Sequence, residues 1–203
     1  MKRAEKRDHL IGIAAELFNR LGYHAAGVDR VIEEAGIAKT TLYRHFGSKE
    51  GLIVAVLRQV DERFRDEMRR TVEAATRDPR ERLLATFDYL ESWFRTDAFL
   101  GCPFMAAAGE FSDRSDPVFK EALMHKRLVI AYFEELARGA NLQDPRVVAQ
   151  EIQLLHEGAT AMAHITGDAG AARRAKAVAA RLLDASTPAT PSRKPAKPGS
   201  RTA

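Results

Sequence analysis

The segment 35–52, AGIAKTTLYRHFGSKEGL, constrains the fold more than any other part of the chain. A short helical segment, residues 28–35, stops at Gly36, and a second short helix is expected over residues 39–46. Ser48 then has the side chain of an N-cap for a longer helix. Two short helices joined by a glycine-containing turn predict a helix-turn-helix, whose second helix can enter the major groove of DNA.

Charge within this segment favours the same interpretation. Residues 37–49 hold Lys39, Arg44, His45 and Lys49 and no acidic residue, which suggests an anionic partner. A solvated basic face is the alternative explanation of such a run. The net charge of +4 adds nothing to this argument, because the tail 186–203 carries four basic residues and no acid and so accounts for the whole excess.

The rest of the chain is patterned as helices, with glycine, proline and aspartate between them. We therefore predict an all-α fold with a helix-turn-helix domain over residues 1–50, a helical domain over 51–185, and a disordered basic tail over 186–203. The predicted helices cover residues 3–21, 28–35, 39–46, 49–77, 80–96, 103–111, 117–139, 145–166 and 171–185.

Composition is that of an ordinary globular protein, with 45% apolar and 30% charged residues. No apolar run approaches the roughly 20 residues of a membrane span, and the basic N-terminus lacks the apolar core of a signal peptide. The lone cysteine, Cys102, excludes an intrachain disulfide and is typical of a reducing compartment. We expect a cytoplasmic protein that does not bind membranes.

Residues 10–57 closely resemble the DNA-binding domain of the tetracycline-repressor (TetR) family of bacterial regulators. The matching pieces are AAELFNRLGY (14–23), VIEEAGIAKTTLYRHF (31–46) and GSKEGL (47–52). The resemblance implies an all-helical homodimer with a small-molecule pocket in its C-terminal part. The chain departs from the family at Ala26, Gly27 and Ala38, where hydroxyl side chains usually cap helices and touch phosphates.

The exposed face near the start of a recognition helix supplies the side chains that reach base edges. That rule makes Lys39, Thr40 and Arg44 candidates for base contacts, and Thr41, Tyr43, His45 and Lys49 candidates for phosphate contacts. The resemblance implies the same backbone role for Tyr43, His45 and Lys49. A basic N-terminal arm of Lys2, Arg3, Lys6 and Arg7 could add affinity.

Large apolar side chains gather between residues 87 and 133, and most of them suit an ordinary core. The family resemblance implies that some enclose an effector pocket, which would suit a hydrophobic ligand. Glu110 is a further possible polar contact. The candidate pocket residues are Phe87, Leu90, Trp93, Phe94, Cys102, Phe104, Met105, His125 and His156.

Cys102 precedes Pro103 and is the expected N-cap of helix 103–111. A thiol there lies at the positive end of the helix dipole, which favours the thiolate. The surrounding GCPFMAAAGEF (101–111) is similar to a stretch in TetR-family regulators that respond to reactive electrophiles. An inert, partly buried thiol is the alternative.

The last two predicted helices carry small and apolar residues at helical spacing, which allows close helix packing. A monomeric core would show the same pattern, and the resemblance favours a twofold dimer that reads a palindromic operator. The candidate interface residues are Ile152, Leu155, Ala159, Met162, Ala175, Val178, Ala179 and Leu182.

An enzyme is the main alternative class, and the sequence argues against it. His156, Glu157 and His164 lack the spacing of a two-histidine zinc helix, Cys102 has no recognisable catalytic partner, and no glycine-rich phosphate loop occurs. We expect no metal and no cofactor. The predicted function is a ligand-responsive DNA-binding regulator, most simply a repressor released by a small hydrophobic or reactive effector; the alternative is a non-specific architectural DNA-binding protein.

Overall fold

The computed structural model describes residues 3–186, and this part of the chain forms nine α-helices and no β-strand. The predicted all-α fold class is confirmed. Lys2 and residues 187–203, which make up nearly all of the predicted tail, lie outside the described residues. The helices are α1 (Arg3–Leu21), α2 (Val28–Ala35), α3 (Lys39–Phe46), α4 (Lys49–Ala75), α5 (Pro79–Phe94), α6 (Pro103–Glu110), α7 (Pro117–Gly139), α8 (Pro145–Thr166) and α9 (Ala171–Ala185).

Capping residues fix the starts of the long helices. Pro79 and Pro117 occupy the first turns of α5 and α7, where a missing N–H costs nothing. Asp78 caps α5 by accepting a hydrogen bond from the amide of Arg80 at 2.8 Å, and Asp116 caps α7 in the same way. These local signals explain why the predicted starts lie within one residue of the observed ones.

Helix α6 ends one residue before its predicted end, and α4 and α5 each end two residues early. Helix α4 ends at Ala75 rather than at residue 77, because Thr76 is extended, with φ −158°. Helix α5 ends at Phe94 rather than at residue 96, and the hydroxyl of Thr96 donates to the carbonyl of Trp93 at 2.8 Å. Threonine side chains compete for backbone groups in this way and favour helix ends.

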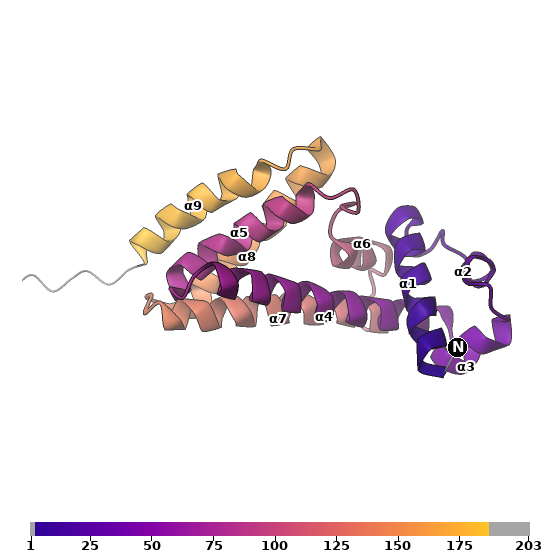
Figure 1. Ribbon diagram of the computed structural model, residues 1–203. Helices are drawn as coiled ribbons and strands as arrows, with labels where there is room; N and C mark the ends of the chain where they lie inside the picture. The colour runs from indigo at the N-terminus through magenta and orange to yellow at the C-terminus, as the bar shows by residue number, and fades with distance from the viewer. Residues whose placement is uncertain (1–2, 187–203) are drawn as a thin grey trace, which may run out of the picture.

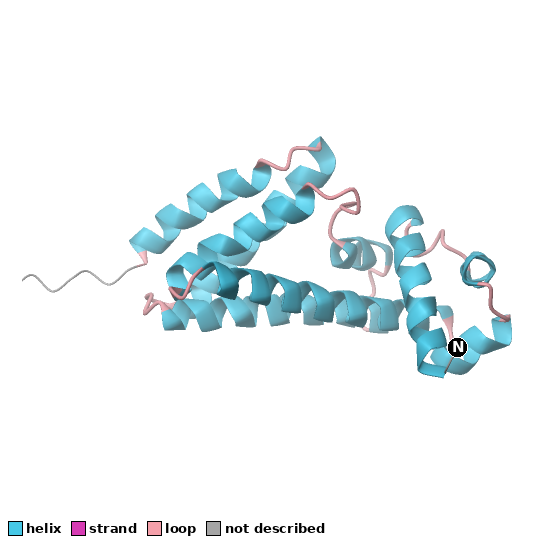
Figure 2. Ribbon diagram, viewed as in Figure 1, coloured by secondary structure: helices cyan, strands magenta, loops and turns pink. Residues whose placement is uncertain are grey.

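Helices α1 to α3 form a compact head at one end of the molecule, and α4 runs from this head into the C-terminal body (Figure 1). In the body, α4 packs on α5 and α7, α5 on α7 and α9, and α8 lies against α7 and α9. The short helix α6 lies between the head and the body, as Figure 2 also shows. None of the described helices is long and apolar enough to cross a membrane.

The described residues form two hydrophobic cores rather than one. The first joins the head to residues beyond position 50, since Leu52 and Leu57 of α4 and Phe104 of α6 belong to it. The second fills the body and includes Phe87 and Phe133, which are fully buried. The head core therefore extends past the predicted boundary at residues 50/51, because the first turns of α4 and part of α6 cover its open side.

Candidate DNA-binding surface and ligand cavity

Helix α3 buries one side and exposes the other. Leu42 is fully buried and anchors the helix in the head core. Lys39, Thr40, Tyr43 and Arg44 are exposed, and the spacing of Thr40 and Arg44 places them one turn apart on the same face. The predicted base-reading residues are therefore all accessible at once.

Lys39 has a partner within the head. Its Nζ donates to Oδ1 of Asp29 in α2 at 2.7 Å, and both side chains are exposed. The hydrogen bond from Lys39 to Asp29 raises the pKa of Lys39, so the ammonium form persists. Exposed ion pairs are weak, so this one can open when an anionic partner approaches.

The remaining predicted phosphate contacts are less accessible than Tyr43. Thr41, His45 and Lys49 are each half-buried. Lys49 donates from Nζ to the carbonyl oxygen of His24 at 3.0 Å, which ties the start of α4 to the turn between α1 and α2. The ammonium group of Lys49 is thus held at the start of α4, just after α3, the second helix of the helix-turn-helix.

Two helices of the head lack side-chain caps. Gly27 precedes α2 and Ala38 precedes α3, and neither makes a side-chain cap hydrogen bond. Ser48, in contrast, accepts from the amide of Gly51 at 3.0 Å and caps α4 as predicted. Relative to a hydroxyl cap, Ala38 costs about 1 kcal/mol and Gly27 only a few tenths of a kcal/mol.

The predicted basic arm is part of a helix. Because α1 begins at Arg3, Lys6 and Arg7 lie in its first turns rather than in an extended segment. The guanidinium of Arg7 lies 5.7 Å from the centre of the Phe46 ring, and Lys6 shares a groove with Thr41. These two cations therefore flank α3.

A cavity of about 220 Å³ opens in the body beneath the head. Six of the nine predicted pocket residues line it: Leu90, Trp93, Cys102, Phe104, His125 and His156. Phe87 and Phe94 are instead buried in the body core, and Met105 is 42% exposed on the outer side of α6. The prediction that these three residues line the cavity is wrong, because they lie on other faces of α5 and α6.

Several lining residues escaped the sequence analysis. Val60 and Phe64 of α4 face the cavity one turn apart, and Gln153 and Glu157 of α8 do the same. Their spacing at i and i+4 was a visible signal. This spacing could not identify lining residues from the sequence, because only the structure shows that α4 and α8 face the same cavity. Lys126 of α7 also lines the cavity, as do Arg63, Glu67, Tyr89, Pro103, Val129 and Thr160.

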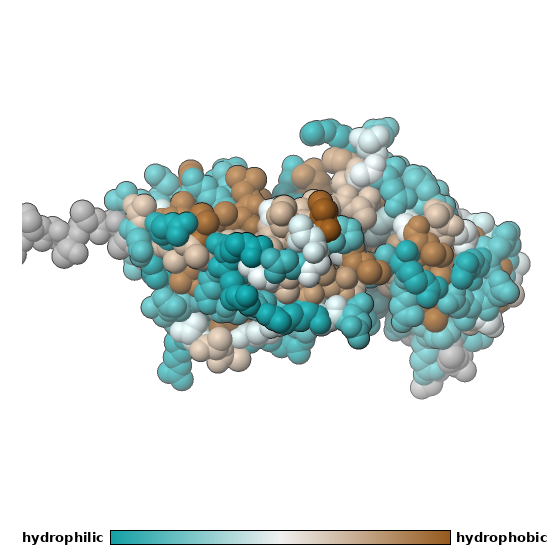
Figure 3. Space-filling view, turned by 90° about the horizontal axis from the view of Figure 1, so that it is seen from above, coloured by the Kyte–Doolittle hydropathy of each residue, from teal (hydrophilic) through white to brown (hydrophobic). Residues whose placement is uncertain are grey.

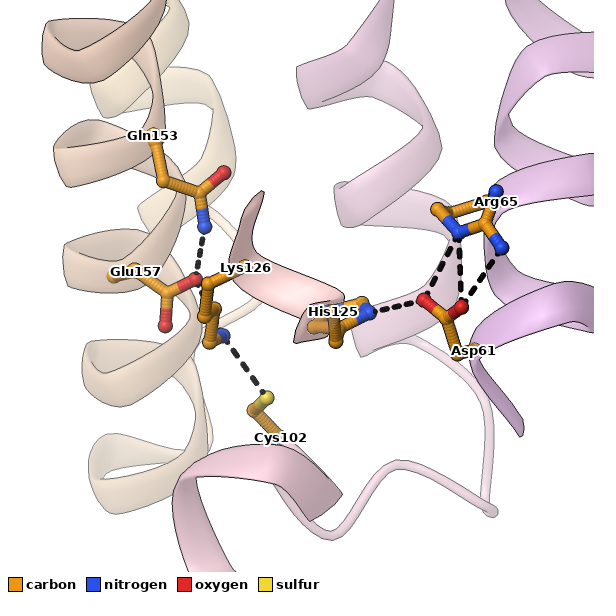
Figure 4. Close-up of polar contacts among 7 residues, drawn as sticks. All are labelled: Asp61, Arg65, Cys102, His125, Lys126, Gln153 and Glu157. Carbon is orange, nitrogen blue, oxygen red and sulfur yellow. Dashed lines mark hydrogen bonds and ion pairs between the residues drawn. The ribbon is translucent and has the colours of Figure 1, made fainter. Parts of the chain in front are cut away.

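Polar groups are connected at one end of the cavity (Figure 4). Nζ of Lys126 lies 3.4 Å from Sγ of Cys102 and 2.6 Å from Oε1 of Glu157. Gln153 donates from Nε2 to the same carboxylate oxygen. Cys102 is the N-cap residue of α6, as predicted, although its side chain makes no cap hydrogen bond.

A second polar group links α4 to α7. Nδ1 of His125 donates to Asp61 at 2.7 Å, and Arg65 binds the same carboxylate (Figure 4). Burial alone raises the pKa of Asp61, but the hydrogen bonds from His125 and Arg65 outweigh it and hold the pKa below its usual range. Burial lowers the pKa of His125, which stacks on Phe104 at a ring separation of 3.7 Å.

The other cavity histidine is also neutral. His156 is 4% exposed, and burial lowers its pKa to about 3. Its Nε2 lies 2.8 Å from Oγ1 of Thr86, whose own hydrogen goes to the carbonyl of Leu83. The imidazole is therefore the donor in this pair, with its hydrogen on Nε2.

Helix α6 connects the cavity to the head. Its first residues, Cys102 and Phe104, line the cavity, and its last residue, Glu110, contacts the α1–α2 turn. The carboxylate of Glu110 accepts from the amides of Tyr23 at 2.9 Å and His24 at 2.6 Å. Glu110 is thus a link between domains and not one of the residues that line the cavity.

The predicted dimer residues fall into two groups. Ile152, Ala159, Ala175 and Ala179 are at most 9% exposed and lie in the body core of a single chain. This placement corrects half of the predicted interface, because α8 and α9 use these positions to pack within one chain. Leu155 and Leu182 are half-buried, while Met162 and Val178 are 51% and 41% exposed.

Exposed apolar residues mark a different face of α8. Leu154 and Ile165 are 71% and 77% exposed, and Val147 is 50% exposed. Figure 3 shows much hydrophobic surface on the C-terminal helices, whereas the outer end of the head is mostly hydrophilic. These three residues share one face of α8, and exposed apolar side chains gathered on a face are typical of an interaction site.

Comparisons with known proteins agree with this architecture. Residues 10–56 match the family described as bacterial regulatory proteins, tetR family, and residues 79–179 match the tetracyclin repressor-like, C-terminal domain. A structure of a TetR-type transcriptional regulator from Streptomyces avermitilis is 30% identical, with a TM-score of 0.76, and the alignment covers 89% of this chain and 97% of that one.

Two curated relatives are transcriptional regulators. LmrA of Bacillus subtilis is 32% identical over 140 residues, which is 67% of this chain and 73% of LmrA. The activator FasR of Mycolicibacterium smegmatis is 39% identical over 95 residues, which span 45% of this chain and only 43% of FasR. Proteins of this kind regulate transcription and are not enzymes. The chain belongs to the TetR family of helix-turn-helix, DNA-binding transcriptional regulators.

Proposed function

We propose that this regulator is a homodimeric repressor that leaves a palindromic operator when a small hydrophobic or reactive effector enters the body cavity. The observation that carries the proposal is helix α6, which begins in the cavity at Cys102 and ends on the head at Glu110. A ligand that displaces the start of this helix also displaces a carboxylate bonded to the head.

The DNA-contacting residues follow from exposure on α3. Lys39, Thr40 and Arg44 contact base edges, with Lys39 leaving Asp29 as DNA approaches. Arginine and lysine suit the guanine acceptors, and threonine offers a hydroxyl or a methyl group. Phosphates are held by Tyr43 and Lys49, and by Thr41 and His45 where the groove wall reaches them; such contacts set position without reading sequence.

The exposed apolar residues of α8 and α9 support the proposed dimer. Leu154, Met162 and Ile165 of α8 and Val178 of α9 are exposed, and a twofold contact would cover them. Two heads related by this axis read two inverted half-sites, one helical turn of DNA or a multiple apart. The protein then acts in the cytoplasm, where bacterial operators lie.

Release requires two states of the dimer. In one state the heads match successive major grooves, and in the other they do not. The effector shifts this equilibrium only by its differential affinity for the two states, typically 1–3 kcal/mol for such coupling. Glu110 is the contact that transmits the shift, because it holds the amides of Tyr23 and His24 directly.

A reactive effector is supported by the position of Cys102. Its Sγ lies at the cavity wall, 3.4 Å from Nζ of Lys126. An electrophile held in the cavity would then form a bond to sulfur beside the start of α6. A non-covalent hydrophobic effector would act on the same helix through Phe104.

The experiment begins with selection of binding sites from random DNA by the full chain. The proposal predicts an inverted repeat, and a promoter reporter carrying it should be repressed. The reporter also tests the sign of regulation, since FasR is an activator. Recovery of unrelated sequences at equal affinity would favour the architectural alternative, and unchanged operator affinity at saturating effector would refute ligand-controlled release.

A further inference from the structure

One wall of the body cavity is built from aromatic rings. Phe64 lies at its centre, with ring-centre distances of 5.5 Å to Tyr89, 5.7 Å to Trp93 and 5.6 Å to His125, all edge-to-face. Phe64 and Trp93 are half-buried, and both line the cavity. Flat aromatic ligands fit such walls because rings stack or meet edge to face.

Gln153 lines the far end of the cavity, and its buried side-chain oxygen is an acceptor that no described donor reaches. An ionised carboxylate only accepts hydrogen bonds, so Gln153 must turn its NH₂ group toward Glu157 and its oxygen away from it (Figure 4). Gln153 is 7% exposed, and its Oε1 has no hydrogen-bond partner among the described residues. A buried acceptor left unmatched in this way carries a free-energy penalty that a ligand donor would remove.

The charges that face this end of the cavity are already balanced. Lys126 pairs with Glu157 at 2.6 Å, and burial keeps His125 and His156 in their neutral forms. Asp61, which accepts a hydrogen bond from His125, forms an ion pair with Arg65. Arg63 and Glu67 of α4 also line the cavity, but both are exposed to solvent. A charged ligand at the Gln153 end would therefore lose its hydration without gaining a buried, unpaired counter-charge, which is unfavourable.

We infer that the cavity binds a neutral aromatic molecule whose O–H or N–H group donates a hydrogen bond to Oε1 of Gln153. The inference rests on the proposed effector function and names the ligand class of the same site. The aromatic body lies against Phe64 and Trp93, and the donor group reaches the α8 end of the cavity. The thiol of Cys102 lies nearby and takes no part in this recognition.

The test compares two probes of similar shape, 2-naphthol and its methyl ether 2-methoxynaphthalene, of which only the naphthol donates. Equilibrium dialysis against the full chain gives both affinities, and emission of Trp93, the chain's single tryptophan, reports occupancy of the cavity. One neutral hydrogen bond should make 2-naphthol bind roughly 2- to 12-fold more tightly. The anion 2-naphthoate should bind more weakly than 2-naphthol.

Gln153→Leu removes the acceptor and should bring the two affinities together. Gln150→Leu is the matched control, an exposed glutamine one turn earlier on α8, and should keep the difference. Equal binding of the two probes by the wild-type chain would overturn the inference, as would a difference that survives in a folded Gln153→Leu variant. Tighter binding of 2-naphthoate, or no binding of either naphthalene, would also overturn it.

These measurements use no DNA, so they separate the two proposals. Selective binding of 2-naphthol without release of the operator would leave the ligand class standing and refute effector control. Release of the operator by compounds that bind equally with and without a donor would support effector control and refute the ligand class.

Discussion

Replacing His156 with glutamine should flatten the dependence of folding stability on pH. The imidazole is 4% exposed between the rings of Phe87 and Phe133, with ring-centre distances of 4.3 Å and 4.8 Å. Burial lowers its pKa to about 3 in the folded chain, against 6.5 for an ordinary histidine. Between these two pH values the unfolded chain binds one proton more than the folded chain.

Stability therefore rises with pH in this window and is lost as the pH falls from 6.5 toward 3. Each pH unit below 6.5 costs 2.303RT, or about 1.4 kcal/mol. Lowering the pH from 7 to 5 should thus remove about 2 kcal/mol through His156 alone. Other groups also titrate in this range, so the informative quantity is the difference between wild type and variant.

Urea unfolding at pH 7 and pH 5, at one fixed protein concentration, gives that difference. His156→Gln keeps an amide donor near Thr86 and does not titrate, so its stability should fall by about 2 kcal/mol less than that of the wild type. His164→Gln replaces an exposed histidine of the same helix and serves as the control. The same pH dependence in wild type and His156→Gln would refute the argument that His156 is buried as a neutral ring.

Three further perturbations test other parts of the structure. Arg44→Ala should relax base preference, whereas Lys49→Ala should weaken binding to all sequences about equally and reduce the salt slope by about 1; equal loss of selectivity in binding-site selections from both variants would contradict the base-contact assignment. Gly51→Ala should destabilise the chain by about 1–3 kcal/mol in urea unfolding, because the new Cβ would lie 2.0 Å from the carbonyl oxygen of Phe46. Gly12→Ala meets no atom within 4 Å, so a similar loss there would contradict the steric explanation. Cys102→Ser should abolish adducts with N-ethylmaleimide by intact mass and any operator release by electrophiles, and electrophile-induced release that persists would end the reactive-effector hypothesis.

The helices were predictable because their signals are local. Gly36 ends α2 with φ +62°, a conformation that glycine adopts without strain, and Ser48 caps α4 through the amide of Gly51. The reason for a glycine at position 51 of this motif becomes visible only in the three-dimensional structure. Its side of α4 touches the end of α3, so the family's GSKEGL pattern records a packing limit that the sequence alone does not explain.

The cavity could be predicted only in part. The family resemblance and the concentration of large side chains between residues 87 and 133 suggested Trp93, Phe104 and His125, which line the cavity. The same reasoning assigned Phe87 and Phe94 to the cavity, although both pack in the body core. Amphipathic spacing tells which residues share a face of a helix, but not which neighbouring helix or cavity that face meets.

Half of the predicted dimer interface was wrong for the same reason. Small residues such as Ala159 and Ala179 signal close packing of α8 and α9, and that packing proved to lie within one chain. Exposed residues such as Leu154 and Ile165 remain available to pack against a partner chain. A sequence pattern cannot distinguish close contacts within a chain from those between chains.

Capping, glycine turns and helical spacing act over a few residues, so the sequence by itself determined the all-α class, the helix-turn-helix and most helix boundaries. Its motifs also carried the resemblance to a family of DNA-binding regulators. Only the tertiary structure decided which side chains surround the cavity, that His125 and His156 are buried as neutral rings, and that Glu110 ties α6 to the α1–α2 turn. These features depend on how α4, α6, α7 and α8 lie against one another. That arrangement arises from packing between residues far apart in the chain, which no local pattern encodes.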